Sequence, residues 1–106
     1  MKTLNRAYLI VNPTNKFWNL IGPSIEDKDF IAFHEPTLYL IEEEIWDEEL
    51  IITKYMKKIT KNEISQVTDQ DISTILIETS EDFLSYFTIE LGGTVVDCLS
   101  ASIERL

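Results

Sequence analysis

The chain has 106 residues, of which 44% are hydrophobic, so it can bury the core of one globular domain without disulfides or metals. We therefore expect a single domain over residues 1–106. Nine Lys and Arg against nineteen Asp and Glu give a net charge of −10, which argues against direct binding to nucleic acid or to an anionic membrane and favours a basic partner.

Cysteine usage and hydropathy bear on the compartment. Cys98 is the only cysteine, so no intrachain disulfide can form, and this is typical of the reducing cytoplasm, where we expect the protein. The apolar residues around Cys98 predict a buried structural thiol. The apolar run 7–11 is too short for a signal-peptide core, and no apolar span is long enough for a membrane helix.

The N-terminal third predicts a strand, a helix and a second strand. Residues 6–11 are mostly apolar and predict a buried strand, after which Thr14 is expected to cap a short helix that ends before Gly22. The alternation in residues 29–34 predicts the next strand. Large apolar residues cluster on one side of the helix and are expected in the core: Phe17, Trp18 and Ile21.

Residues 36–61 have two interpretations. A single helix places like charges four residues apart, as in Lys54 and Lys58, and each such pair costs about 0.2–0.5 kcal/mol, although acids early and bases late suit the helix dipole. A hairpin that turns near residues 47–49 instead pairs Glu43 with Lys54 across the two strands. We favour the hairpin, and the helix is the alternative.

The C-terminal part predicts a loop, two strands and a helix. Residues 61–71 are polar and predict a loop, and the β-branched run 72–78 predicts a strand. Ser80 is expected to cap a helix that Gly92 and Gly93 close, and residues 94–103 predict a last strand. Taken together, the elements predict an α+β fold, a single domain whose mixed, mainly antiparallel sheet of five to six strands carries two helices on one face.

Motifs for catalysis or cofactors are absent from the sequence. His34 is the only histidine and belongs to no recognisable motif, and the chain has neither a phosphate-binding glycine loop nor enough Cys and His for zinc. A strand-end histidine with a local hydrogen bond is the expected role of His34. We therefore expect a protein that is not an enzyme, with no catalytic residue, no metal and no cofactor.

The densest charge in the chain is the acidic segment, residues 42–49. Six of its eight residues are acids, and a tryptophan lies among them. Runs of like charge are often only a solvated face. Tryptophan is enriched at binding hot spots, however, so the segment is also a candidate partner-binding surface. The candidate residues are Glu42, Glu43, Glu44, Trp46, Asp47, Glu48 and Glu49.

A small, acidic, cytoplasmic chain without catalytic motifs resembles the immunity proteins of bacterial polymorphic-toxin and contact-dependent growth-inhibition systems. The resemblance covers the general character of the whole chain and no specific motif. It implies that the acidic segment binds a basic partner, a toxin nuclease domain, and blocks its nucleic-acid-binding cleft, with Trp46 as an anchor.

Two other functions remain open. Residues 62–104 carry nine acids and no base, which favours a nucleic-acid mimic of the anti-restriction or anti-CRISPR kind. A small enzyme or metal-binding domain that uses a carboxylate cluster is the third possibility.

Overall fold

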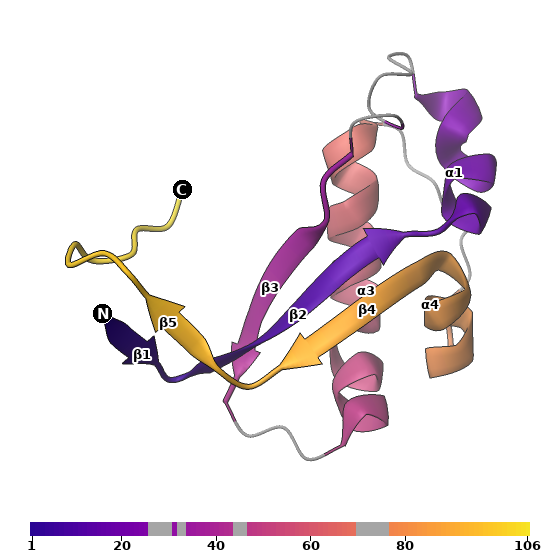
Figure 1. The fold of residues 1–106 in the computed structure, drawn as a ribbon. Coiled ribbons are helices and arrows are strands. Elements are labelled where there is room, and N and C mark those ends of the chain that lie inside the picture. The colour runs from indigo at the N-terminus through magenta and orange to yellow at the C-terminus, as the bar shows by residue number, and fades with distance from the viewer. Residues whose placement is uncertain (26–30, 32–33, 44–46, 70–76) are drawn as a thin grey trace.

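The computed structural model describes residues 1–25, 31, 34–43, 47–69 and 77–106. In these residues the helices lie on one face of an antiparallel sheet, and a short pair of strands extends from the sheet (Figure 1). In chain order the elements are β1 (Lys2–Leu4), β2 (Arg6–Pro13), α1 (Asn15–Ile21), the 3-10 turn η1 (Gly22–Ser24), β3 (Thr37–Glu42), α3 (Glu48–Val67), α4 (Ser80–Tyr86), β4 (Phe87–Gly92) and β5 (Val95–Asp97).

The central strand of the sheet is β2, which pairs with β3 on one side and β4 on the other. Every second residue of β2 is buried against the helices: Ala7, Leu9 and Val11. This alternation is the period-two pattern of a strand with one face on the core. The prediction of a strand over residues 6–11 is confirmed, and it extends to Pro13.

Among the described residues, the core lies between the inner face of the sheet and helices α1, α3 and α4. Aromatic rings form its centre, because Phe87 contacts both Phe17 and Phe83 at ring-centroid distances of 5.0 Å. Apolar residues of every neighbouring element join them in one cluster: Leu9, Val11, Ile21, Ile25, Ile52, Met56, Ile59, Val67 and Ile77. The predicted core role of α1 is confirmed for Phe17 and Ile21, and Trp18 packs against the cluster.

The longest element, α3, is a helix because burial outweighs the like-charge pairs along it. Its buried side chains recur every three or four residues and form one stripe: Ile52, Met56, Ile59, Glu63 and Val67. Each buried aliphatic side chain stabilises the fold by about 1.5–3 kcal/mol, several times the cost of a like-charge pair. Asp47 caps the helix, since its Oδ1 accepts hydrogen bonds from the backbone N–H of Glu49 (3.0 Å) and Leu50 (3.4 Å).

The hairpin predicted for residues 36–61 is therefore wrong, and so is the single helix. Residues 37–42 form strand β3, which pairs with β2. The chain then enters α3, which continues to Val67 through most of the loop predicted over residues 61–71. The buried stripe is hard to recognise in the polar sequence after Lys61, because one of the buried positions of the stripe is Glu63.

The C-terminal part also differs from prediction. The cap of α4 is Thr79, one residue before Ser80, and the helix ends at Tyr86. Residues 87–92, predicted as its last turns, instead form β4 against β2, because Phe87, Ile89 and Leu91 alternate toward the core face. The strand predicted over residues 94–103 shortens to Val95–Asp97.

Two of the predicted strands lie largely outside the described residues, namely 29–34 and 72–78. Cys98 is exposed, which corrects the prediction of a buried thiol. The α+β class is confirmed, but the sheet is not the single one of five to six strands. The described strands form a three-stranded sheet, β3-β2-β4, and a separate two-stranded ladder, β1-β5.

A bulge separates these two ladders. The last pair of the β2-β4 ladder is Tyr8 with Gly92, and the first pair of the next is Leu4 with Val95. Three residues, 5–7, separate these pairs on one strand and two, 93–94, on the other, so the first strand holds one extra residue. We call β1, β5 and residues 98–106 the arm, which projects from the sheet in Figure 1.

Gly92 has no room for a side chain, because an added Cβ would overlap the ring of Tyr8 on the neighbouring strand. We expect Gly92→Ala to reduce the free energy of unfolding by about 1–3 kcal/mol, the usual cost of overpacking. Urea unfolding measures the loss. The double variant Tyr8→Leu/Gly92→Ala should recover part of it, and a double variant as unstable as the sum of both single changes would contradict this contact.

Candidate functional site

The acidic segment forms the connection between β3 and α3, at the lower end of the molecule in Figure 1. Glu42 is the last residue of β3, and Glu48 is the first of α3. Glu44 and Trp46, including the proposed anchoring role of Trp46, lie outside the described residues. The other five candidate residues are described, and they divide into two groups.

Two of these five, Glu42 and Asp47, have a structural role. Lys54 Nζ lies 2.8 Å from Glu42 Oε1, and the Tyr55 hydroxyl donates to the other carboxylate oxygen of Glu42. The hydrogen bond from Lys54 lowers the pKa of the Glu42 carboxyl. The partner of Lys54 is thus Glu42, not Glu43 as the hairpin predicted. Asp47, through the two backbone hydrogen bonds described above, completes the start of α3.

The remaining described acids of the segment are exposed, namely Glu43, Glu48 and Glu49. Glu48 and Glu49 lie in the first turn of α3, where the positive end of the helix dipole stabilises carboxylates. Their position therefore contributes to the helix and also leaves both carboxylates facing solvent.

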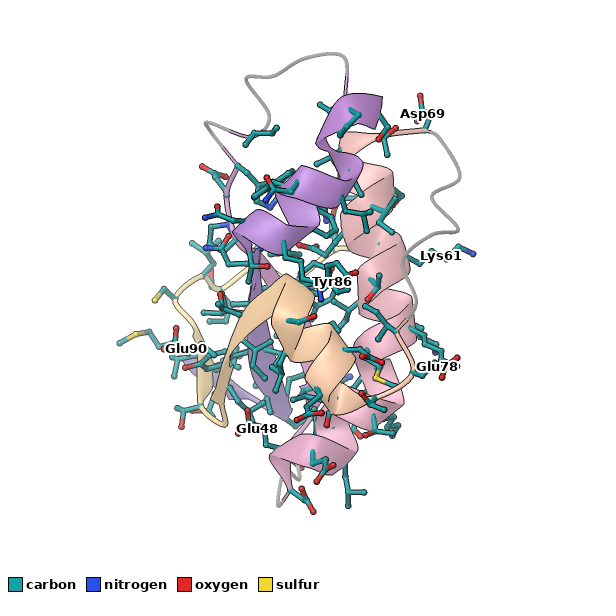
Figure 2. All side chains as sticks on the ribbon, turned by 90° about the vertical axis from the view of Figure 1, so that its right-hand side faces the viewer. Glu48, Lys61, Asp69, Glu78, Tyr86 and Glu90 are labelled. Atoms are coloured by element: carbon teal, nitrogen blue, oxygen red, sulfur yellow. The ribbon has the colours of Figure 1, made fainter. Side chains whose placement is uncertain are left out.

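The start of α4 lies beside the start of α3. Ser80 Oγ donates to Glu49 Oε1 at 3.5 Å, and Figure 2 shows the lower end of α4 against the lower half of α3. This brings in exposed acids from a second part of the sequence, at positions 78 and 81. We call the resulting set the acidic pole: Glu43, Glu48, Glu49, Glu78 and Glu81.

Asp82 fixes the start of α4 and is not part of the pole. Its Oδ2 accepts hydrogen bonds from the backbone N–H of Glu78 (3.0 Å) and Thr79 (3.1 Å), and its own N–H donates to the Thr79 hydroxyl. These backbone hydrogen bonds lower the pKa of the Asp82 carboxyl. The spacing Thr79-x-x-Asp82 is a capping box, the sequence signal that could have placed Glu78 and Glu81 at a helix start.

A second polar feature lies inside the molecule, between β3 and α3. Glu63 is 1% exposed, and its Oε2 accepts a hydrogen bond of 2.6 Å from the Tyr39 hydroxyl. Asn62 Nδ2 donates to that hydroxyl at 3.0 Å. Glu63 Oε1 has no hydrogen-bond partner among the described residues. Burial, followed by the hydrogen bond to Glu63, raises the pKa of Tyr39, so this phenol keeps its proton and remains the donor.

His34 packs edge-on against the Trp18 ring, with centroids 5.1 Å apart, and its buried Nε2 lacks a hydrogen-bond partner among the described residues. Within the described ranges, no three His, Cys, Asp or Glu residues gather as a metal site would require. In the same ranges, no helix is both long and apolar enough to cross a membrane.

No family model, curated protein or solved structure matches this chain.

The lowered pKa of Asp82 predicts an acid-dependent stability. A carboxyl whose pKa is lower in the folded than in the unfolded chain stabilises the fold above the unfolded value, near 3.9, and loses that contribution as the pH falls through the folded value. The melting temperature of Asp82→Asn should therefore lie below that of the native chain at pH 7 and approach it as the pH falls below the unfolded value. Glu81→Gln is the control, and a constant difference across this range would contradict the prediction.

The buried pair Tyr39–Glu63 predicts a non-additive double mutant. Tyr39→Phe removes the donor to Glu63 and should cost about 1–3 kcal/mol, since the carboxylate then lacks a partner. Tyr39→Phe/Glu63→Leu replaces both groups with apolar ones and should be more stable than Tyr39→Phe alone. Urea unfolding of the two single variants and the double variant measures the coupling, which would be near zero if the pair were energetically irrelevant.

Proposed function

We propose that this chain is a small binding protein that neutralises a basic protein partner through the acidic pole, as an immunity protein does when it blocks the nucleic-acid-binding cleft of a toxin nuclease. The observation that supports this best is that exposed carboxylates stand at the starts of α3 and α4, which lie side by side although they are 32 residues apart in the sequence.

The free carboxylates of the pole support a role in binding. Glu48 and Glu81 form no hydrogen bond or ion pair among the described residues, and both are exposed. By contrast, Glu42 and Asp82 already hold internal donors. Carboxylates without internal partners retain their capacity to accept hydrogen bonds from Arg and Lys of another protein.

The distribution of charge along α3 supports the same conclusion. The exposed bases Lys57, Lys58 and Lys61 lie at least eight residues beyond Glu49, and Lys54 is paired with Glu42. The α3 part of the pole is therefore of one sign on a chain that already carries −10, and on the α4 side Lys16 donates to Ser85 Oγ. Such a field accelerates association with a basic surface, by one to three orders of magnitude at low salt.

A nuclease cleft is the kind of basic surface that suits the pole. Clefts that bind nucleic acid carry Lys and Arg positioned for phosphates, and carboxylates at two neighbouring helix starts can occupy those positions. A nucleic-acid mimic would spread its acids in a row at phosphate spacing, about 3.4 Å per charge along one strand. The described acids at 48, 49, 78 and 81 instead lie at or next to two helix starts, which the Ser80–Glu49 hydrogen bond joins.

The test uses the product of the gene next to this one as the candidate partner. We expect Glu48→Lys/Glu81→Lys to weaken binding about 30- to 1000-fold, since reversing two contact charges costs about 2–4 kcal/mol. Calorimetry at about 50 and 300 mM NaCl measures the affinity, and the native affinity should fall steeply with salt.

The matched control is Glu35→Lys/Asp69→Lys, which changes the net charge equally at two exposed acids outside the pole. Figure 2 shows Asp69 at the opposite end of α3 from Glu48. Equal losses in the two variants would show that only net charge matters and would refute the pole as the contact surface. If the partner is a nuclease, its inhibition can be measured as well. Inhibition by both variants as strong as that by the native chain would also refute the pole as the contact surface.

A further inference from the structure

The outer face of the sheet carries an apolar surface that no described element covers. Cross-strand register places Tyr8 opposite Leu40 and Ile10 opposite Leu38, so these four side chains share one face. Leu38 and Leu40 are 54% and 46% exposed. All described helices pack on the other face, as Figures 1 and 2 show from two directions. We call Tyr8, Ile10, Leu38 and Leu40 the outer patch.

The arm carries a second apolar surface. Val96, Leu99 and Ile103 are 46%, 71% and 60% exposed. The radius of gyration is 15.1 Å, compared with about 13 Å for a compact chain of this length. The arm projects from the sheet, so these apolar side chains have no surface to pack on among the described residues (Figure 1).

The direction of the arm is fixed by strand pairing. β1 and β5 pair through Lys2–Asp97, Thr3–Val96 and Leu4–Val95, and the bulge joins this ladder to the β2-β4 ladder. The arm is thus a continuation of the sheet, and residues 98–106 start from its far end (Figure 1). A segment held in this way is better placed to reach a neighbouring molecule than its own outer patch.

The charges near the two surfaces suit contact between copies of the chain. On the outer face Arg6 and Glu90 carry one charge of each sign, while Glu42 is paired with Lys54. The arm has two bases and two acids: Lys2, Arg105, Asp97 and Glu104. The acid excess of the molecule therefore lies elsewhere, so contact between arm and outer patch brings together two nearly neutral surfaces.

We propose that two copies of this chain form a symmetric dimer in which the arm of each copy covers the outer patch of the other. In a reciprocal exchange, the arm and the outer patch of each copy are both covered. No uncovered arm or patch then remains to bind a third copy. Each copy then contributes seven apolar side chains, three from the arm and four from the patch. That number suits the energetically dominant centre of an interface of about 20–30 residues a side. The proposed contact uses no residue of the acidic pole, so it is independent of the proposed function.

Sedimentation equilibrium of the full chain between about 1 μM and 1 mM tests the dimer. Leu38→Glu/Leu40→Glu alters the patch, and truncation after Asp97 removes most of the arm. Each change should weaken dimerisation at least about 100-fold, since it places charge in, or removes area from, an apolar contact. Circular dichroism confirms that each variant is folded. The control Leu84→Glu alters a side chain that is 44% exposed on α4, on the helical side, and should remain dimeric.

A mixture of the patch variant and the truncated chain distinguishes arm exchange from other modes of dimerisation. The truncated chain keeps its patch and the patch variant keeps its arm, so a 1:1 mixture should restore one of the two contacts and form a heterodimer. A native chain that is monomeric at 1 mM overturns the proposal. Dimers that survive both changes, or a mixture that does not associate, also overturn it, because a patch-to-patch dimer has no such complementation.

Discussion

The structure depends on the packing of α3 against the inner face of the sheet. Burial of one stripe of side chains on this helix, contributing about 1.5–3 kcal/mol per aliphatic residue, determines that residues 48–67 are helical and which way they run. The same contact holds β3 and α3 antiparallel, so the connection between them, and its acids, lies at one end of the molecule. The hydrogen bond between Ser80 and Glu49 links the start of α4 to this end of α3. The acidic pole is therefore a consequence of core packing and not an independent feature.

The two sides of the molecule differ in chemistry, and this difference underlies both proposals. The helical side has exposed carboxylates at the starts of α3 and α4, where the helix dipoles offset part of their mutual repulsion. The sheet side exposes leucines on β3 beside nearly balanced charge. A chain with a net charge of −10 can associate with itself only through a region that has little of that charge. The strongly charged end remains available to a molecule of opposite sign.

Sequence reasoning succeeded where a local pattern had one interpretation. The strand at residues 6–11 and the helix that ends at Ile21 were predicted closely, as was the α+β class, although Thr14 makes no side-chain cap hydrogen bond at the start of α1. It failed at α3, where like-charge pairs were weighed against cross-strand pairs but burial of the stripe was not counted. It failed again at residues 87–91, whose apolar positions fit helical and strand periods alike. Of the candidate residues, Glu43, Glu48 and Glu49 are exposed, although Glu43 was expected to pair with Lys54. Glu78 and Glu81 join them only through tertiary contact, which no local pattern contains.

Glu63 is the one charged side chain in the apolar stripe of α3, so it distinguishes one position along the helix from the others. Its neighbours one turn away on the same face are Ile59 and Val67, and neither can accept a hydrogen bond from a side-chain hydroxyl. If α3 slid along the sheet by one turn, the Tyr39 hydroxyl would face one of these aliphatic side chains, and a carboxylate would enter the hydrocarbon without its donor. Apolar contacts alone tolerate such sliding, because one methyl surface resembles the next. The hydrogen-bonded pair Tyr39–Glu63 thus fixes the position of α3 along the sheet.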